Sequence, residues 1–461
     1  MASVDATAVR FADAVRYLTQ RPDLERGIPG STLSLAGIRA LLGALGRPDQ
    51  RYPSVLIAGT KGKGSTAAMI ERSLRSAGYR TGLYTQPDLH TIRERVRIDG
   101  QPISAEDFSD GIEVVRAATE RATATSTYTT YELMTAAALD RFSRHAVDVA
   151  VIEVGLGGRM DATNAVAASV SALTSISLDH TQILGNTVAA IAREKADIIK
   201  QGQPIVSAPQ PPEALAVIRE MAAERGARLI VADDGARWQE FPSDHWNLIT
   251  GAGRLDDVRL SLRGGFQRIN AAVATTALLA LPEVAGFSLE LGAIRTGLED
   301  TDWPGRFEMV AIDPLIIVDG AHNVESAQRL REALAEELPG RRPTYVLGIA
   351  ADKDIGGIVR ALCSPSTGAR TAPAPRLVIA TASRHPRAAA AETIATAVRE
   401  TGTETTVAET LHNAIRQARR EAAVEGVVLV TGSLHLVAEA REHLGLAEPS
   451  GEQAFDPWAT P

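Results

Sequence analysis

SVLIAGTKGKGSTAAMIERSLRSAG, residues 54–78, joins a short apolar run to a longer helical pattern through a turn that contains three glycines. The apolar run is rich in aliphatic and β-branched residues and predicts a buried strand, while the second part predicts a helix. Glycine lets the backbone of the turn curl with its amides pointing inward, and the start of a helix adds positive potential. The stretch therefore predicts an anion-binding loop between a strand and a helix.

Similar apolar runs recur along the chain and alternate with longer helical patterns. They lie at 147–155, 170–177, 203–208, 228–232, 315–321, 343–349, 376–381 and 427–433. Nearly continuous apolar strands separated by helices are typical of parallel sheets that are covered on both faces. The predicted fold class is therefore α/β.

The chain of 461 residues is too long for one hydrophobic core, so we expect at least two domains. The segment RTGLEDTDWPGRFE, residues 295–308, ends a helical pattern, and Pro304 and Gly305 break it before strands resume. We predict a first domain at 1–297, a linker at 298–305, a smaller second domain at 306–446 and a tail at 447–461.

Composition and charge exclude several classes of protein. A net charge of −8 with no basic block argues against a nucleic-acid partner, because phosphate backbones recruit concentrated lysine and arginine. The single cysteine, Cys363, excludes an intrachain disulfide and a cysteine-based zinc site. The N-terminal stretch lacks the apolar segment of a secretion signal, and the apolar stretch 271–289 is interrupted by Pro282 and Glu283. We therefore predict a buried helix at 271–289 and a cytoplasmic protein that does not enter a membrane.

The glycine-rich loop has the side chains that phosphate binding requires. Lys63 would reach the outer phosphates of a nucleotide, and the hydroxyl of Ser65 could coordinate Mg2+. The spacing G-x-x-G-K-G-S differs from the common phosphate-binding pattern G-x-x-x-x-G-K-[ST]. A glycine-rich connector that binds no ligand is the alternative interpretation.

Two further strand ends carry polar residues. Glu153 ends one apolar run, and a carboxylate at the carboxyl end of a strand lies where α/β sheets bind ligands and suits Mg2+. Asp179 and His180 end another, and Lys195 follows on the next predicted helix. The alternatives are a turn cap for Glu153, a satisfied polar group for His180, and a surface i, i+4 pair for Lys195.

Taken together, the motifs resemble the folylpolyglutamate synthase family, including its bifunctional dihydrofolate synthase forms, within the Mur ligase superfamily. The resemblance covers nearly the whole chain, and the order and spacing of the motifs make it specific. It is carried by residues 31–66, by EVGLGGRMDATN at 153–164, by SLDHTQILGNTVAAIAREKADIIK at 177–200, by WPGRFE at 303–308, by DGAHN at 319–323 and by VTGSLHLVAEAR at 430–441. The shorter form of the glycine-rich loop is the form that this family uses.

The resemblance implies an ATP-dependent amide ligase that joins L-glutamate to folate, with dihydropteroate as an alternative acceptor. The γ-phosphate of ATP moves to the acceptor carboxylate, and the glutamate amine attacks the resulting acyl phosphate. A P-loop ATPase domain on a parallel sheet would be followed by a smaller Rossmann-like α/β domain. The implied nucleotide-binding residues of the loop are Gly59, Thr60, Gly62, Lys63, Gly64, Ser65 and Thr66.

By the same resemblance, two Mg2+ ions are expected. Ser65 and Glu153 would hold one ion, and His180 would help to hold the second. Lys195 matches a lysine that the family carboxylates with CO2, which converts its ammonium into an oxygen ligand. Lys63, His180 and Lys195 are therefore the implied catalytic residues.

The family also uses residues outside the loop. Arg306, Asp319 and His322 match residues that contact ATP from across an interdomain cleft, and Asn270 matches a residue near the adenine. Asp161 matches a position implicated in binding the pterin. The alternatives are a surface ion pair for Arg306 and helix capping for Asp319 and the neighbouring asparagine, Asn323.

The chain departs from the family pattern at three positions. In TQPDLHTIRERVRIDG, residues 85–100, Gln86 replaces the usual serine and Asp88 the usual histidine, and His435 stands where relatives often have an aromatic residue. Two other functions therefore compete with folate ligation: a ligase with a different carboxylate acceptor, such as a muramyl nucleotide, and a nonenzymatic ATP-binding switch. We expect a monomer with small-molecule substrates.

Overall fold

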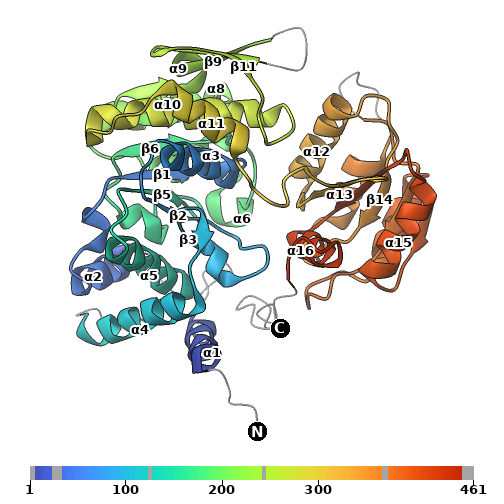
Figure 1. Cartoon of the computed structure of the whole chain (residues 1–461), viewed down its shortest axis with the longest axis horizontal. Coiled ribbons are helices and arrows are strands. Elements are labelled where there is room, and N and C mark those ends of the chain that lie inside the picture. Colours follow the sequence, from blue (N-terminus) through green and yellow to red (C-terminus); the bar gives the residue numbers. More distant parts are fainter. Residues whose placement is uncertain (1–5, 23–33, 123–126, 241–245, 366–371, 449–461) are drawn as a thin grey trace. The chain divides into compact units, whose positions relative to one another are not determined.

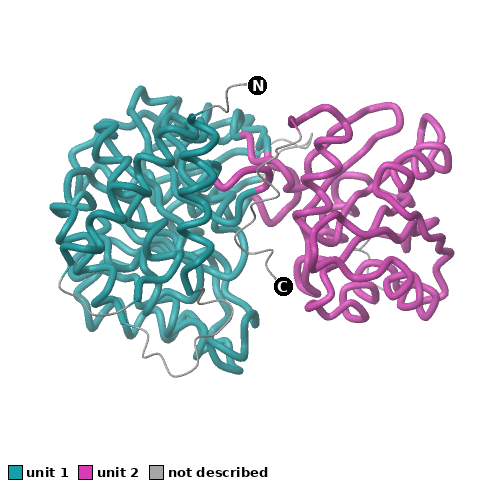
Figure 2. Tube along the Cα trace, turned by 90° about the horizontal axis from the view of Figure 1, so that it is seen from below, with its two compact units in different colours: residues 1–88, 93–261, 268–301 teal, residues 89–92, 262–267, 302–461 magenta. Residues whose placement is uncertain are grey.

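The structure is a computed structural model that describes residues 6–22, 34–122, 127–240, 246–365 and 372–448. The chain divides into two compact units (Figure 2). The first unit comprises residues 1–88, 93–261 and 268–301, and the second comprises residues 89–92, 262–267 and 302–461. Residues 449–461 of the predicted tail lie outside the described residues. The predicted domain limits stay a prediction.

The first unit is built on an eight-stranded sheet in the order β4-β3-β2-β5-β1-β6-β7-β8. Its strands are β1 (Ser54–Ala58), β2 (Thr81–Tyr84), β3 (Val96–Ile98), β4 (Gln101–Pro102), β5 (Val149–Glu153), β6 (Val170–Leu173), β7 (Ile205–Ser207) and β8 (Leu229–Val231). The six strands from β2 to β8 in this order run parallel, and only β3 and β4 pair in antiparallel fashion. The predicted parallel sheet is therefore confirmed.

The central strands β1 and β5 are buried at every position, which explains why their sequences are apolar throughout instead of alternating. Helices cover both faces of the sheet, with α10 and α11 on one side of the strands and α2, α4 and α5 on the other (Figure 1). The α-helices of this unit are α1 (Ala6–Thr19), α2 (Ala36–Ala44), α3 (Lys63–Ser76), α4 (Ala105–Arg121), α5 (Thr130–Arg144), α6 (Thr181–Leu184), α7 (Val188–Ala196), α8 (Pro212–Glu224), α9 (Ala232–Gly235), α10 (Phe266–Ala285) and α11 (Leu291–Asp300). Within the described part of the unit, short 3-10 helices lie at Pro48–Gln50, Ile92–Arg95 and Ala162–Ala165.

The apolar stretch 271–289 falls largely within α10, so the predicted helix is confirmed, and Pro282 lies inside it. Within the described residues, no helix combines the length and the apolar character that crossing a bilayer requires. A separate antiparallel sheet was not predicted. It consists of β9 (Ala236–Glu240), β10 (Trp246–Thr250) and β11 (Gly253–Val258). Polar residues predominate in β9 and β11, so their sequences show no buried strand pattern.

The second unit contains a six-stranded sheet in the order β12-β13-β17-β14-β15-β16. Its strands are β12 (Glu308–Ile312), β13 (Leu315–Asp319), β14 (Thr344–Leu347), β15 (Leu377–Ala380), β16 (Thr405–Val407) and β17 (Val427–Thr431). Its helices are α12 (Val324–Glu337), α13 (Ile355–Cys363), α14 (Ala391–Glu400), α15 (Leu411–Ala422) and α16 (Leu434–His443). All strands except the edge strand β12 run parallel.

Two apolar cores lie on the two faces of this second sheet. Helices α12, α13 and α14 contribute to one core, which includes Ile317 and Cys363, and helices α15 and α16 contribute to the other, which includes Ile316 and Val318. Successive residues of β13 therefore point to opposite faces, as strand geometry requires. This three-layer arrangement is the one expected for a doubly wound α/β fold.

Candidate active site

The glycine-rich loop of the first unit needs glycine at two positions. Gly59 has a φ of +150°, and a Cβ there would lie 1.8 Å from Oγ1 of Thr174 at the end of β6. Gly62 has a φ of +92°, and a Cβ there would lie 2.1 Å from Oδ1 of Asn270 on α10. The loop is thus packed between a strand end and a helix, and a larger residue at either position would displace the neighbour that it faces.

The loop leads directly into α3, as the sequence predicts. The helix begins at Lys63, with Gly62 as its N-cap residue. The amides of Lys63, Gly64 and Ser65 belong to the first helical turn, which has no intrahelical acceptors for them, so they form a positive end suited to an anion. Ser65 is buried at this end.

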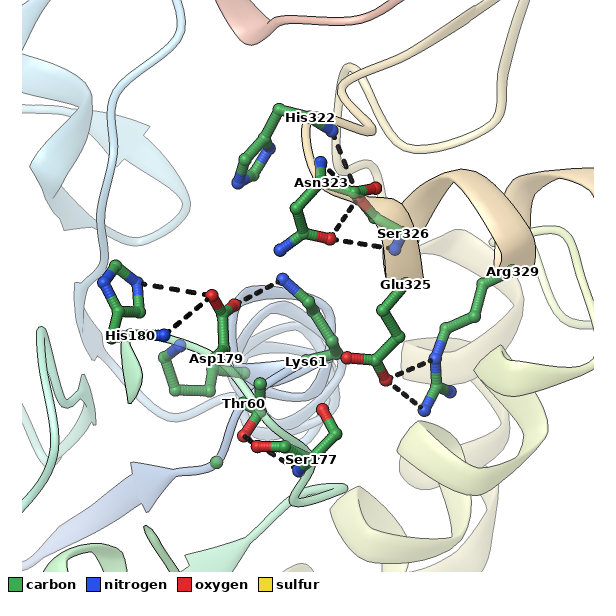
Figure 3. A network of polar contacts seen from close by, with 12 residues as sticks. Thr60, Lys61, Ser177, Asp179, His180, His322, Asn323, Glu325, Ser326 and Arg329 are labelled. Atoms are coloured by element: carbon green, nitrogen blue, oxygen red, sulfur yellow. Dashed lines mark hydrogen bonds and ion pairs between the residues drawn. The ribbon is translucent and has the colours of Figure 1, made fainter. Parts of the chain in front are cut away.

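Hydrogen bonds fasten the loop to the segment after β6 (Figure 3). The backbone N–H of Thr60 donates to the carbonyl of Ser175 at 2.9 Å. The hydroxyl of Thr60 donates to the carbonyl of Ser177 at 3.2 Å and accepts from the N–H of Ser177 at 3.1 Å. The ammonium of Lys61 donates to Oδ2 of Asp179 at 2.8 Å. The phosphate-binding loop and the Asp179 loop therefore form one connected structure.

The ion pair controls the charge of Asp179. Burial alone would raise the pKa of its carboxyl group, but Lys61 and His180 outweigh burial and lower the pKa to about 2. His180 has a left-handed backbone with a φ of 49°, and its N–H donates to Oδ1 of Asp179 at 3.0 Å. The imidazole of His180 is half exposed. Figure 3 shows it beside Asp179. Asp179 thus fixes the loop that presents His180.

Glu153 lies at the end of β5 and is 4% exposed. Its Oε1 lies 3.8 Å from Nζ of Lys63, and its Oε2 accepts from the N–H of Gln86 at a long 3.3 Å. This buried carboxylate lies close to Lys63, the first residue of α3, and offers the oxygen ligands that Mg2+ prefers. Among the described residues, no three His, Cys, Asp or Glu side chains form a metal cluster, so the predicted sites depend on the serine and lysine as well.

Lys195 is 5% exposed, and its Nζ donates to the carbonyl of Gly59 at 2.8 Å. Burial lowers the pKa of Lys195 to about 7, and repulsion from Lys63 and Lys61 adds to this effect, while Asp179 and Asp161 oppose it. Lys195 therefore contacts the glycine-rich loop from inside the unit, and its interpretation as a surface pair is wrong.

The acidic neighbours of Lys195 have other partners. Glu194 pairs with Arg159 at 2.9 Å, and Asp197 pairs with Arg225 at 2.5 Å. These pairs leave the ammonium of Lys195 directed at the loop carbonyl. A surface position could not be distinguished from a buried one in the sequence AREKADIIK, because burial depends on the packing of α7 against the rest of the unit.

Asp161 is also in the first unit and is 6% exposed. It accepts hydrogen bonds from the N–H of Leu156 at 2.9 Å, the N–H of Thr163 at 2.9 Å and the hydroxyl of Thr163 at 2.5 Å. Burial raises the pKa of Asp161, and these hydrogen bonds act against the shift. Asp161 thus shapes its own loop, and its predicted contact with a substrate stays a prediction.

Gln86 and Asp88, the two residues of the 85–100 segment that depart from the family pattern, both lie close to other residues of the first unit. Oδ1 of Asp88 accepts from Nε of Arg95 at 2.6 Å, and Arg95 is 3% exposed. The side-chain amide of Gln86 lies so close to Gly155 that a Cβ there would be 2.6 Å from Nε2. Both residues therefore hold a loop beside Glu153.

In the second unit, the predicted residues gather at the end of β13. Asp319 accepts from the N–H of Phe307 at 2.8 Å and from the N–H of Ala321 at 2.9 Å. Burial raises the pKa of Asp319, whereas Arg306 and the two backbone donors lower it. Asp319 does not cap a helix but joins two loops, and the guanidinium of Arg306 donates to the carbonyl of Gly305 at 3.2 Å.

His322 and Asn323 follow immediately (Figure 3). Nδ1 of His322 lies 2.9 Å from the carbonyl of Gly320, which fixes this nitrogen as the protonated one. Asn323 is the N-cap of α12 and forms a capping box with Ser326, so the capping interpretation of Asn323 is confirmed.

Lys61 was not predicted to belong to the site. The sequence contains one signal that could have identified it, which is the scarcity of lysine: the chain has five lysines. In the structure, three of them, Lys61, Lys63 and Lys195, meet at the glycine-rich loop. Arginine supplies most positive charge elsewhere. A compact ammonium is better suited than a guanidinium to a narrow site beside phosphate or metal.

Two family models match this chain. The Mur ligase middle domain matches residues 57–278, and the Mur ligase glutamate ligase domain matches residues 305–434. The dihydrofolate synthase/folylpolyglutamate synthase of Bacillus subtilis is 37% identical over 337 residues, which cover 71% of this chain and 78% of the relative. The chain belongs to the Mur ligase family. Its branch is that of the folylpolyglutamate and dihydrofolate synthases, so the predicted family is confirmed.

The match covers only part of one longer relative. The probable bifunctional folylpolyglutamate synthase/dihydropteroate synthase of Halobacterium salinarum is 39% identical over 445 residues. These residues cover 94% of this Mur ligase family member but 51% of the relative, so the chain spans about half of that protein.

Solved structures agree with the assignment. The folylpolyglutamate synthase of Mycobacterium tuberculosis complexed with ADP has a TM-score of 0.83 at 32% identity and covers 95% of this chain and 99% of its own. E. coli FolC in complex with DHPP and ADP has a TM-score of 0.82 at 31% identity, with 96% and 99% covered. The fold class and the class of ATP-dependent glutamate ligase are therefore confirmed at the level of the family.

Proposed function

We propose that this chain is a folylpolyglutamate synthase that uses ATP to join L-glutamate to a folate carboxylate through an acyl phosphate. One structural observation carries the proposal. The positive end of α3, Lys63, the buried carboxylate of Glu153 and the buried Lys195 meet at one glycine-rich loop.

The first step brings a carboxylate to a triphosphate, so two negative charges must approach each other. The acceptor oxygen forms a bond to the γ-phosphorus, the bond to the β,γ-bridging oxygen breaks, and ADP leaves. Lys63 and the first-turn amides of α3 stabilise charge that develops on the transferred phosphoryl group. Ser65 and Glu153 would hold one Mg2+ and His180 a second, and such ions supply the remaining charge neutralisation.

In the second step, the amine of glutamate attacks the acyl carbon. A carbon–nitrogen bond forms, the carbon–oxygen bond to phosphate breaks, and the amine loses a proton. The products are the amide, ADP and inorganic phosphate. Arg306, Asp319 and His322 of the second unit and Asn270 of the first are the proposed ATP contacts outside the loop.

We also propose that Lys195 carries CO2 as a carbamate. Formation of the carbamate consumes a free amine, and burial lowers the pKa of Lys195 to about 7, so a free amine is present near neutral pH. An ammonium at this position would repel a nearby Mg2+, whereas a carbamate supplies two oxygens. The carbamate would thus extend the oxygen donor set of the loop.

Dihydropteroate is the second acceptor to consider. The E. coli FolC structure contains DHPP, and the Bacillus subtilis relative is named for both activities. Asp161 is the proposed acceptor-binding residue of this chain. A cytoplasmic location, a monomeric state and small-molecule substrates without nucleic acid or membrane stay predictions from the sequence.

The test is mass spectrometry of products formed by the full chain from ATP, Mg2+, glutamate and either tetrahydrofolate or dihydropteroate. Tetrahydrofolate should gain the mass of a glutamyl residue, with equimolar ADP. A product from dihydropteroate would add the dihydrofolate synthase activity. A muramyl acceptor that reacts while both pterins fail would replace the proposal with another ligase, and no ATP turnover with any acceptor would favour a nonenzymatic switch.

A further inference from the structure

Two histidines face each other on the second unit, on helices that the proposed reaction does not use. His412 lies in the first turn of α15, and His443 is the last residue of α16. Their Nδ1 atoms are 3.2 Å apart, and their rings meet at an interplanar angle of 76° with centroids 4.5 Å apart. Both residues are exposed, so solvent and ions reach them.

The distance between the two nitrogens suits a shared metal ion. With metal–nitrogen bonds of about 2.0–2.1 Å, nitrogens 3.2 Å apart subtend an angle of roughly 100° at the metal. This angle lies between those of octahedral and tetrahedral coordination. Neutral imidazole suits Zn2+, Ni2+ and Cu2+, whereas Mg2+ prefers oxygen ligands.

The surroundings of His443 keep its imidazole available as a ligand. Partial burial lowers the pKa of His443, and the nearby His412 and Arg419 lower it further, so the neutral form predominates at neutral pH. Arg419 also repels a metal cation, whereas the carboxyl end of α16 attracts one. The choice between metal ions therefore depends on the imidazole nitrogens as ligand atoms and not on a strong local charge.

We propose that His412 and His443 form a surface site for a divalent transition cation such as Zn2+. The cation would take Nδ1 from each residue, complete its shell with water, and join the start of α15 to the end of α16. Without metal, one Nδ1 carries a hydrogen that it donates to the other. This site is independent of the proposed ligase reaction.

A second histidine pair in the same unit provides a matched control. His385 and His435 are stacked, with ring centroids 3.8 Å apart and an interplanar angle of 13°. Stacked rings present their faces to each other, so their nitrogens do not converge on one point. Substitution of either pair removes two imidazoles, but only the His412 and His443 pair has the chelating arrangement.

The experiment is isothermal titration calorimetry of the full chain with ZnCl2 in a buffer that contains excess Mg2+. The proteins are the native chain, His412→Gln, His443→Gln, the double variant of this pair, and the control His385→Gln/His435→Gln. We expect each single variant to weaken one Zn2+ site by about tenfold or more, because two ligands on one scaffold bind cooperatively. The double variant should lose that site, and the control should keep it.

A thermal unfolding series provides the second measurement. Zn2+ should raise the unfolding temperature of the native chain and of the control by more than it does for the double variant, because binding to the folded form stabilises it. Unchanged Zn2+ stoichiometry and affinity in the double variant would overturn the proposal. Loss of the same site in the control pair would overturn it as well. Circular dichroism in the far ultraviolet verifies that every variant is folded.

Discussion

The strand-end loops of the two units use polar residues in opposite ways. At the end of β1, lysines from three positions converge on backbone and carboxylate groups, and Lys63 has a loose 3.8 Å ion pair. At the end of β13, Asp319 has both carboxylate oxygens engaged by backbone N–H groups. The first loop concentrates positive charge that a ligand can neutralise. In the second loop, Asp319 stabilises the conformation of the loop itself.

This difference predicts how the two loops respond to substitution. Removing a lysine from the first loop removes attraction for phosphate but little of the packing. Removing Asp319 from the second leaves two buried donors without their acceptor, which costs stability. Variants that separate activity from stability therefore test the comparison.

Lys63→Ala should have the largest effect. We expect kcat/KM for ATP-dependent ligation to fall about 10²–10³-fold, because charge stabilisation of the transferred phosphoryl group is lost. The unfolding temperature should stay close to that of the native chain. Lys61→Ala is the matched variant in the same loop and should cost less, because Lys61 is paired with Asp179. A near-native rate for Lys63→Ala would contradict its assigned role.

Lys195→Ala should lose about 10²-fold in rate while it still binds ATP, and a short carboxylic acid should restore part of the activity by filling the vacated space. Lys200→Ala is the matched control, because burial also lowers the pKa of Lys200, to about 8, but its ammonium bonds to Asn164. The rates are measured with and without added formate or acetate. Full activity of Lys195→Ala would rule out the carbamate.

Asp319→Ala should lower the free energy of unfolding by about 1–3 kcal/mol, since the N–H groups of Phe307 and Ala321 lose their acceptor. Lys63→Ala should change it by less than about 0.5 kcal/mol, as expected for a change outside the core. Urea unfolding of both variants provides the comparison. Equal stability of the two would remove the distinction between the loops.

Arg306→Ala should raise the KM for ATP by about threefold to tenfold, which corresponds to about 0.7–1.4 kcal/mol, within the range for the loss of one typical hydrogen bond. It should leave kcat nearly unchanged. Steady-state kinetics at saturating glutamate and folate measure both constants. An unchanged dependence on ATP would return Arg306 to a structural role beside Asp319.

The smallest effect concerns the pH dependence of the Asp179 ion pair. Because the folded pKa of about 2 lies below the ordinary value of 3.8, the carboxylate stabilises the fold above pH 4. That contribution is lost as the pH falls from about 4 to about 2, and we expect roughly 1 kcal/mol after allowing for partial exposure. Asp179→Asn should therefore be less stable than the native chain at pH 6, and the difference should shrink towards pH 2. A constant difference would contradict the assignment.

The sequence predicted the parts of the fold that depend on continuous apolar runs. Central strands such as β1 and β5 are buried on both faces, so their sequences identify them. The sheet of β9, β10 and β11 was missed because sequences such as GRLDDV carry no clear alternation. Periodicity therefore found the covered parallel sheets but not a small, polar sheet.

The site was predicted from residue types at strand ends, but its contacts depend on packing across the chain. The approach of Asn270 to Gly62 and the burial of Lys195 against Gly59 join residues that are far apart in sequence. No local pattern reports such distances. The partnership of Lys61 with Asp179 was missed for the same reason.

The most direct test of the account is the fate of oxygen in the acceptor carboxylate. Folate labelled with 18O in the carboxylate that receives glutamate is incubated with the full chain, ATP, Mg2+ and glutamate, and the released inorganic phosphate is analysed by mass spectrometry. An acyl phosphate transfers one labelled oxygen to phosphate in every turnover, and Lys63→Ala should release almost no phosphate. Amide product with unlabelled phosphate would contradict phosphoryl transfer to the acceptor at the glycine-rich loop.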